Sequence, residues 1–121
     1  MFIKKILLSL VAILLVFTLP AQKSLKGTWL VGKDNTKIET YQKGEEWFGK
    51  VVETDNPKIE IGTDILMGFK KTEGEWCGKI LAMRFNKIMD AKIEPAKDVL
   101  FVKVTMGFIS KKMKWLRVKE D

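Results

Sequence analysis

Apolar and polar residues alternate with a period of two along most of the chain after residue 27, which is the pattern of β-strands with one buried face. The run from Met89 to Glu94 alternates strictly, and so does the run from Leu100 to Met106. No long segment repeats apolar residues at helical spacing, so we expect no long helix. Turn-forming residues divide the chain, which predicts strands near residues 27–32, 36–43, 46–53, 64–71, 75–83, 87–94, 98–106 and 111–119.

Short turns between consecutive strands predict an antiparallel meander, and a meander of this length can close on itself. Closure removes the unpaired sheet edges that promote aggregation. The predicted fold is therefore all-β, an eight-stranded antiparallel meander closed into a β-barrel. Its interior is expected to be filled by side chains or to hold one small ligand. Nothing marks a linker, so residues 22–121 are interpreted as one domain.

Residues 1–21 have the features of a secretory signal peptide. A short basic region with Lys4 and Lys5 precedes an almost wholly apolar run, and small Ala21 follows. The apolar run is short for a bilayer span, so we expect cleavage, after Ala21 or Gln22, rather than a retained anchor. We therefore expect an exported protein, periplasmic or secreted, without an integral membrane span after cleavage.

Composition excludes several kinds of catalytic and metal site. The chain is 46% hydrophobic and 31% charged, with no histidine and a single cysteine, Cys77. A histidine-based triad, a Cys/His zinc site and an intrachain disulfide are therefore excluded, and we expect no metal and no cofactor. Glu53 and Asp55 share the parity of Trp47 and are the best carboxylate candidates for a hydrolase. We nevertheless expect no enzyme, and a structural rather than reactive thiol at Cys77.

The positive charge comes mostly from lysine. Cleavage would remove Lys4 and Lys5 and lower the formal net charge from +7 to +5. Nucleic-acid readers use arginine for bidentate contacts, and this chain has only Arg84 and Arg117, so no nucleic-acid partner is expected. The lysines are interpreted either as a solvated surface or as the source of weak contact with an anionic envelope surface.

A short internal sequence repeat indicates which strand face points inward. Glu46-Trp47-Phe48-Gly49-Lys50 recurs as Glu75-Trp76-Cys77-Gly78-Lys79. In each copy the tryptophan and glycine share one strand face, and lysine lies on the other. We expect the tryptophan face to point into the barrel, with each glycine making room for a bulky neighbour or allowing the strand to bend.

The first and last predicted strands must be neighbours in a closed meander. Gly27 and Trp29 open the first, and Trp115 and Arg117 end the last. Arg117 is expected to lie across the Trp29 indole and to close one barrel end by a cation–π contact. This arrangement resembles the Gly-x-Trp motif and final-strand arginine of lipocalins, which implies a lipocalin-like (calycin-type) barrel. The alternative is ordinary edge packing of a tryptophan.

An ordered series of motifs over residues 25–118 extends this resemblance. It includes Asp55-Asn56-Pro57 and Ile65-Leu66-x-Gly68-Phe69 between the two tryptophan–glycine copies. The series resembles the bacterial domain-of-unknown-function family "twenty-one forty-seven", small exported proteins. That resemblance implies a lipocalin-like barrel with a candidate internal site and no established activity. Residues 82–89 depart from the family's usual hairpin, so no pocket contact is carried over from it.

Two functions remain open. The first is a non-catalytic protein that binds a small apolar or amphipathic envelope ligand, the expected lining being Ile38, Thr40, Trp47, Val51, Trp76, Ile80, Val102 and Val104. The alternative is a solid barrel that binds an envelope protein or polymer through its lysine-rich surface, at Lys111, Lys112 and Lys114 with Phe108 or Ile109 beside them. A filled interior behind Trp47 and Trp76 favours the second.

Overall fold

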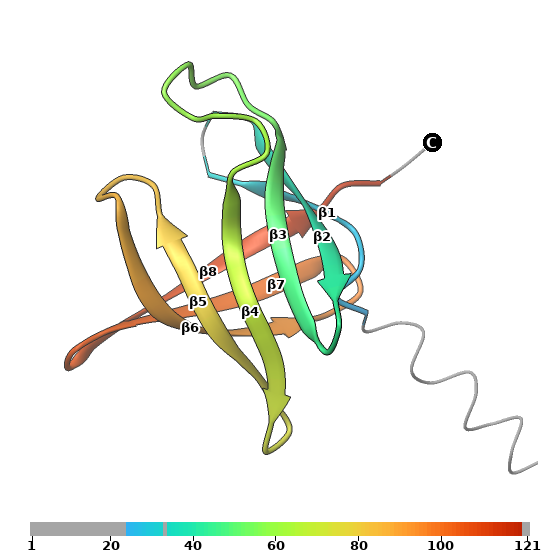
Figure 1. The fold of residues 1–121 in the computed structure, drawn as a ribbon, viewed down its shortest axis with the longest axis vertical. Coiled ribbons are helices and arrows are strands. Elements are labelled where there is room, and N and C mark those ends of the chain that lie inside the picture. The colour runs from blue at the N-terminus through green and yellow to red at the C-terminus, as the bar shows by residue number, and fades with distance from the viewer. Residues whose placement is uncertain (1–23, 33, 120–121) are drawn as a thin grey trace, which may run out of the picture.

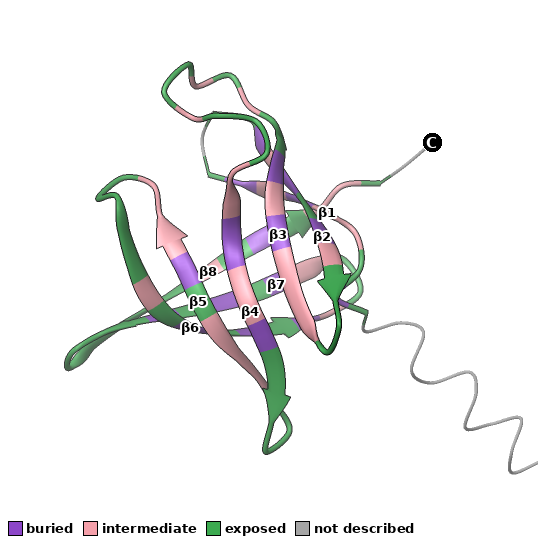
Figure 2. Cartoon of the chain, in the orientation of Figure 1, coloured by how far each residue is buried: buried purple, intermediate pink, exposed green. Residues whose placement is uncertain are grey.

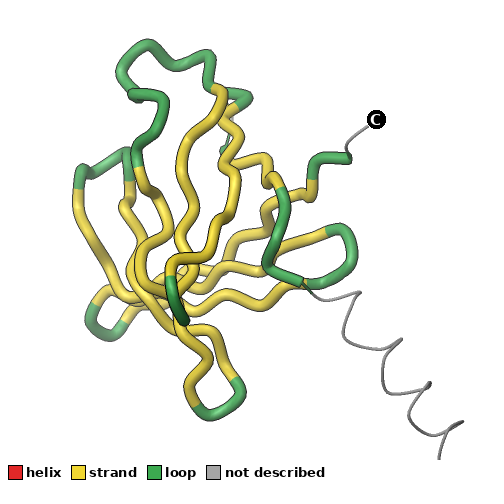
Figure 3. The backbone as a smooth tube through the Cα atoms, turned by 45° about the vertical axis from the view of Figure 1, so that its right-hand side comes forward, coloured by secondary structure: helices red, strands yellow, loops and turns green. Residues whose placement is uncertain are grey.

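The computed structural model describes residues 24–32 and 34–119, which form strands and loops without a helix (Figure 3). The predicted signal segment, residues 1–21, lies outside the described residues. Within them, no helix has the length and apolar character needed to cross a bilayer. The strands are β1 (Thr28–Val31), β2 (Thr36–Lys43), β3 (Glu46–Glu53), β4 (Asp64–Thr72), β5 (Glu75–Ala82), β6 (Lys87–Pro95), β7 (Val99–Met106) and β8 (Ile109–Arg117).

Each strand pairs antiparallel with the next, and β8 returns to pair with β1 (Figure 1). The predicted eight-stranded closed meander is confirmed. The expected range 111–119 for the last strand was wrong, because the β7–β8 turn is only two residues long. Gly107 has a φ of 59°, which suits the first position of a tight hairpin turn, and Ile109 therefore already pairs with Met106.

The two tryptophan–glycine copies pack against bulky side chains from neighbouring strands. A Cβ atom on Gly78 would lie 2.7 Å from the Phe69 ring and 2.9 Å from the carbonyl oxygen of Met67. A Cβ on Gly49 would lie 3.0 Å from a terminal methyl of Ile38 and 3.1 Å from one of Leu66. Both glycines therefore make room for large core residues, which is one of the two roles expected for them from the sequence repeat.

The barrel core consists of inward side chains, which along most strands alternate with more exposed ones (Figure 2). Trp29, Ile38, Phe69 and Leu100 are completely buried in it. Leu25 joins the same core, although it precedes the first strand. The N-terminal segment therefore folds across one end of the barrel and inserts an apolar side chain there.

Candidate functional site

The residues expected to line a ligand site all belong to the packed barrel interior or its rim. Trp47 and Trp76 are half-buried and pack against the core. The other six are buried, and they are Ile38, Thr40, Val51, Ile80, Val102 and Val104. Their burial shows a filled interior at these positions, and binding of a ligand there stays a prediction.

The Thr40 hydroxyl forms hydrogen bonds with the N-terminal segment. The Thr40 Oγ1 donates to the carbonyl oxygen of Leu25 at 2.7 Å and accepts from the backbone N–H of Gly27 at 2.9 Å. Both bonds tie the N-terminal segment to β2. Because a buried hydroxyl with satisfied bonds is costly to redirect, Thr40 has little capacity left for a ligand.

Arg117 closes the same barrel end. Its guanidinium carbon lies 4.2 Å from the centroid of the Trp29 indole. Its N–H groups donate to the carbonyl oxygens of Lys97 (2.8 Å), Lys26 (2.8 Å), Ser24 (2.9 Å) and Ala96 (3.2 Å). The arginine therefore joins β8 to the N-terminal segment and to the β6–β7 loop, while Gly27 leaves the space that the guanidinium occupies. Trp115, two residues before Arg117 on β8, is buried in the core.

A hollow lies against the outer face of the barrel, and the inward, half-buried Trp76 and Met113 also border it. It measures about 790 Å³ and spans strands β5 to β8. Ile93 and Val102 border it but expose only 4% and 1% of their surface, so their side chains point away into the core. The side chains that face it are the outward ones of alternate positions, Glu75, Lys92, Glu94, Phe101, Lys103, Lys112 and Lys114.

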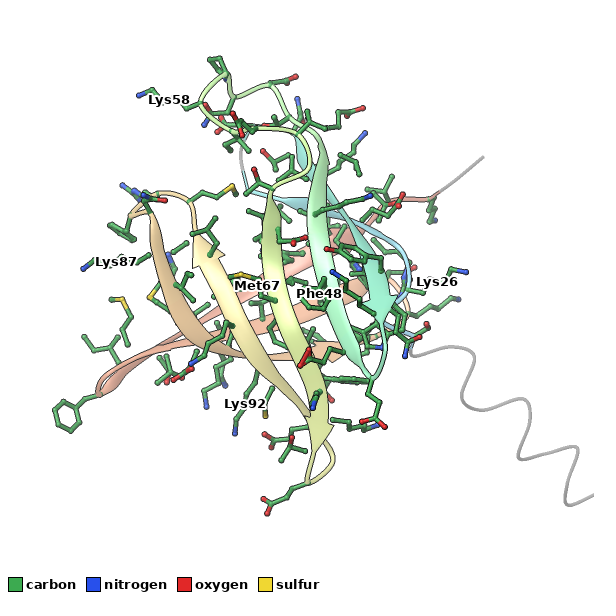
Figure 4. The ribbon with its side chains drawn as sticks, in the orientation of Figure 1. Lys26, Phe48, Lys58, Met67, Lys87 and Lys92 are labelled. Atoms are coloured by element: carbon green, nitrogen blue, oxygen red, sulfur yellow. The ribbon has the colours of Figure 1, made fainter. Side chains whose placement is uncertain are left out.

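Three lysines form a row across this outer surface. Lys92 is the cross-strand partner of Lys103, and Lys103 is the partner of Lys112. Directly opposed residues of an antiparallel pair have Cβ atoms about 5 Å apart, and like charges there destabilise the sheet. We call Lys92, Lys103, Lys112 and the adjacent Lys114 the lysine face; Figure 4 labels Lys92 on it.

Only part of the positive charge of the lysine face is paired with carboxylates of the same chain. Lys92 pairs with Glu75 at 2.8 Å, and this hydrogen bond lowers the pKa of Glu75 and raises that of Lys92. Among the described residues, no carboxylate lies within ion-pair distance of Lys103, Lys112 or Lys114. Lys114 lies over the Phe101 ring at 5.8 Å. The lysine face therefore keeps an unpaired positive centre at Lys103 and Lys112.

Comparison with known proteins fits the motif series. Residues 27–117 match the model of the family described as "Uncharacterized protein conserved in bacteria (DUF2147)". The chain belongs to this family. No curated protein and no solved structure matches the chain well enough to indicate a relative. For this DUF2147 protein, the match covers nearly the whole barrel, and the family description names no function.

The two carboxylates singled out from the sequence have partners on the barrel surface of this family member, and the thiol lies on the outer face of β5. Glu53 pairs with Lys37 at 2.9 Å, and Asp55 accepts a hydrogen bond from Asn35 at 2.7 Å. Cys77 points outward on β5 opposite Lys92 and is partly buried. Within residues 24–32 and 34–119, no three acidic or cysteine side chains gather as a metal site would require.

The surface patch expected around residues 108–114 is divided by the strand alternation. Lys112 and Lys114 are on the outer face, whereas Lys111 pairs with Val104 and lies on the inner face with Ile109. Phe108 is fully exposed at the hairpin tip. Lys92 and Lys103 were missed, because they are far apart in sequence. Only the strand register brings them beside Lys112.

Proposed function

We propose that this protein is a non-catalytic binding module that takes a negatively charged partner on the lysine face of β6–β8. The observation that carries the proposal is the row Lys92–Lys103–Lys112, in which like charges are directly opposed on three neighbouring strands. An anionic partner relieves that repulsion and gains Coulomb attraction from several lysines at once. The outer hollow of about 790 Å³ supplies room for such a partner.

Export, expected from residues 1–21, makes an envelope protein or polymer the natural kind of partner. The contact would be electrostatic in character, because lysine supplies point charges rather than the fixed bidentate geometry of arginine. Its affinity should therefore fall steeply as salt is added. The filled interior supports a surface site over an internal one.

The test measures binding of two labelled polyanions, poly-L-glutamate and dextran sulfate, by fluorescence anisotropy at low and high salt. The variant Lys103→Gln/Lys112→Gln removes the unpaired centre and should weaken binding at least about tenfold. The control Lys26→Gln/Lys58→Gln removes the same charge at positions far from Lys92 (Figure 4) and should change binding less than about threefold. Equal losses in both variants would show a net-charge effect and refute the proposal.

A second candidate is the small amphipathic ligand expected from the sequence. It is favoured by the half-buried state of Trp76, which borders both the hollow of about 790 Å³ and a second hollow of about 220 Å³ with Glu45, Lys70 and Lys71. The second volume is below the usual range of roughly 300–1,000 Å³ for ligand pockets, so only the first has room for such a ligand. Native mass spectrometry of protein purified from its own envelope tests it. A bare-chain mass, together with no competition against a hydrophobic fluorescent probe, contradicts it.

A further inference from the structure

The β7–β8 hairpin extends beyond the part of the barrel that β1 covers. β1 pairs with β8 at Trp29↔Arg117 and Leu30↔Leu116, and β1 ends at Val31. β8 continues in the other direction to Ile109. In Figure 1 the hairpin projects from the barrel at the lower left, and Figure 2 shows its end exposed. The first half of β8 therefore has β7 on one side and no described strand on the other.

The direction of the main-chain groups along this edge follows from the hydrogen bonds at the closed end. The Val118 N–H donates to Thr28 beside β1, whereas the Arg117 N–H donates to Asp98 before β7. Successive residues of a strand direct their N–H and C=O groups to opposite sides. The main-chain groups of Ser110 and Lys112 therefore point to the uncovered side, where a further strand can bind.

The side chains beside this edge select what can pair with it. Lys111 lies on the inner face, and Lys112 with Lys114 on the outer face. Met106 and Ile109 add an exposed apolar surface at the tip, with 50% and 68% of their area accessible. A second copy of this chain paired edge to edge would bring these lysines against their equivalents, and lysines at an edge oppose such pairing.

We propose that the edge of β8 from Ile109 to Lys112 binds an extended acidic segment of a partner protein as an added strand. The inference rests on the proposed function and narrows its partner to a polypeptide, because a polysaccharide lacks N–H and C=O groups at strand spacing. Main-chain hydrogen bonds to Ser110 and Lys112 supply affinity, as in other cases of strand addition. Acidic side chains on both faces of the segment meet Lys111 and Lys112.

The test uses an octapeptide of repeated Glu-Glu-Val-Val, which as a strand carries glutamate on both faces. Its fully N-methylated twin keeps the side chains and charge but has no N–H donors. The parent peptide should slow hydrogen exchange of the Ser110 and Lys112 amides at least about tenfold in the full chain. The Lys111 amide is the internal control, because it already points to β7 and should not change. The twin should bind at least about tenfold more weakly.

Several outcomes overturn the inference. Equal binding of parent and twin, with unchanged exchange at Ser110 and Lys112, shows a purely electrostatic contact and leaves the proposed function standing. Displacement of the peptide by dextran sulfate without any amide protection indicates a polymer partner. Protection of both amides in the free protein at high concentration indicates self-pairing. If the Lys103→Gln/Lys112→Gln variant binds the peptide and the polymer as tightly as the wild-type protein does, the proposed function fails as well.

Discussion

Arg117 lies across the indole of Trp29, its guanidinium carbon 4.2 Å from the ring centroid, at the seam where the last strand meets the first. The same side chain donates hydrogen bonds to carbonyl oxygens on the N-terminal segment and on the β6–β7 loop. A cation–π contact and several charge-assisted hydrogen bonds at one residue make this seam a main determinant of stability. The sequence-based expectation for Arg117 named the ring contact but not the carbonyl contacts.

Replacing Arg117 by lysine should lower the free energy of unfolding by about 2–4 kcal/mol. Lysine keeps the charge, but one ammonium group cannot reach the Lys97, Lys26 and Ser24 carbonyl oxygens together. Urea unfolding followed by tryptophan fluorescence measures the loss. The matched control is Arg84→Lys at an exposed position, for which we expect a change below about 0.5 kcal/mol. Similar losses in both variants contradict the assigned role.

Replacing Gly78 by alanine should destabilise the barrel by about 1–3 kcal/mol. The added Cβ would clash with the Phe69 ring and with the fixed carbonyl oxygen of Met67. Gly49→Ala should cost less, because its nearest neighbours are terminal methyl groups of Ile38 and Leu66 that can shift. Thermal unfolding of the two variants checks the order. A larger loss for Gly49→Ala would show that strand bending, rather than contact with the neighbour, explains the glycines.

Replacing Leu25 by alanine should cost about 2–4 kcal/mol and open space at the barrel end. Leu25 is buried in the core although it lies outside any strand. Lys26→Ala, its exposed neighbour, is the control and should be near neutral. Denaturant unfolding gives the energies, and a hydrophobic fluorescent probe reports on the new space. Unchanged stability in Leu25→Ala would mean that the N-terminal segment does not close the barrel in solution.

Tyr41 is the single tyrosine of the chain, so ionisation of its hydroxyl can be followed without overlap from another tyrosine. Tyr41 donates a 2.7 Å hydrogen bond to Asp64, and this bond, with burial and the negative charge of Asp64, raises the Tyr41 pKa from 10.0 to about 12. The folded state holds this proton more tightly than the unfolded chain does. Tyr41 therefore adds stability below pH 10.0, and this contribution is lost as the pH rises toward about 12.

Ultraviolet absorbance of the tyrosinate follows this titration directly, because the chain has one tyrosine. Asp64→Ala removes the acceptor and should return the Tyr41 pKa toward its ordinary value. Glu53→Ala removes one negative charge elsewhere and should leave the midpoint unchanged. A midpoint near the ordinary tyrosine value in the folded wild-type protein would contradict the hydrogen bond to Asp64.

The sequence by itself determined the fold class, the strand order and most strand bounds of this protein. Period-two alternation identifies which side chains share a face, and turn residues such as Gly44 and Gly107 mark where the chain reverses. Both signals are local, so they can be interpreted without knowing what lies across the sheet. The start of β8 was misplaced because Gly107 and Phe108 alone suffice for the turn.

Only the tertiary structure decided what fills the barrel and what lies side by side on its surface. Leu25 enters the core from outside the strands, and Lys92, Lys103 and Lys112 become neighbours through the register of three strands. Neither relationship is periodic along the chain. Each depends on contacts between residues distant in sequence, and register and closure set those contacts.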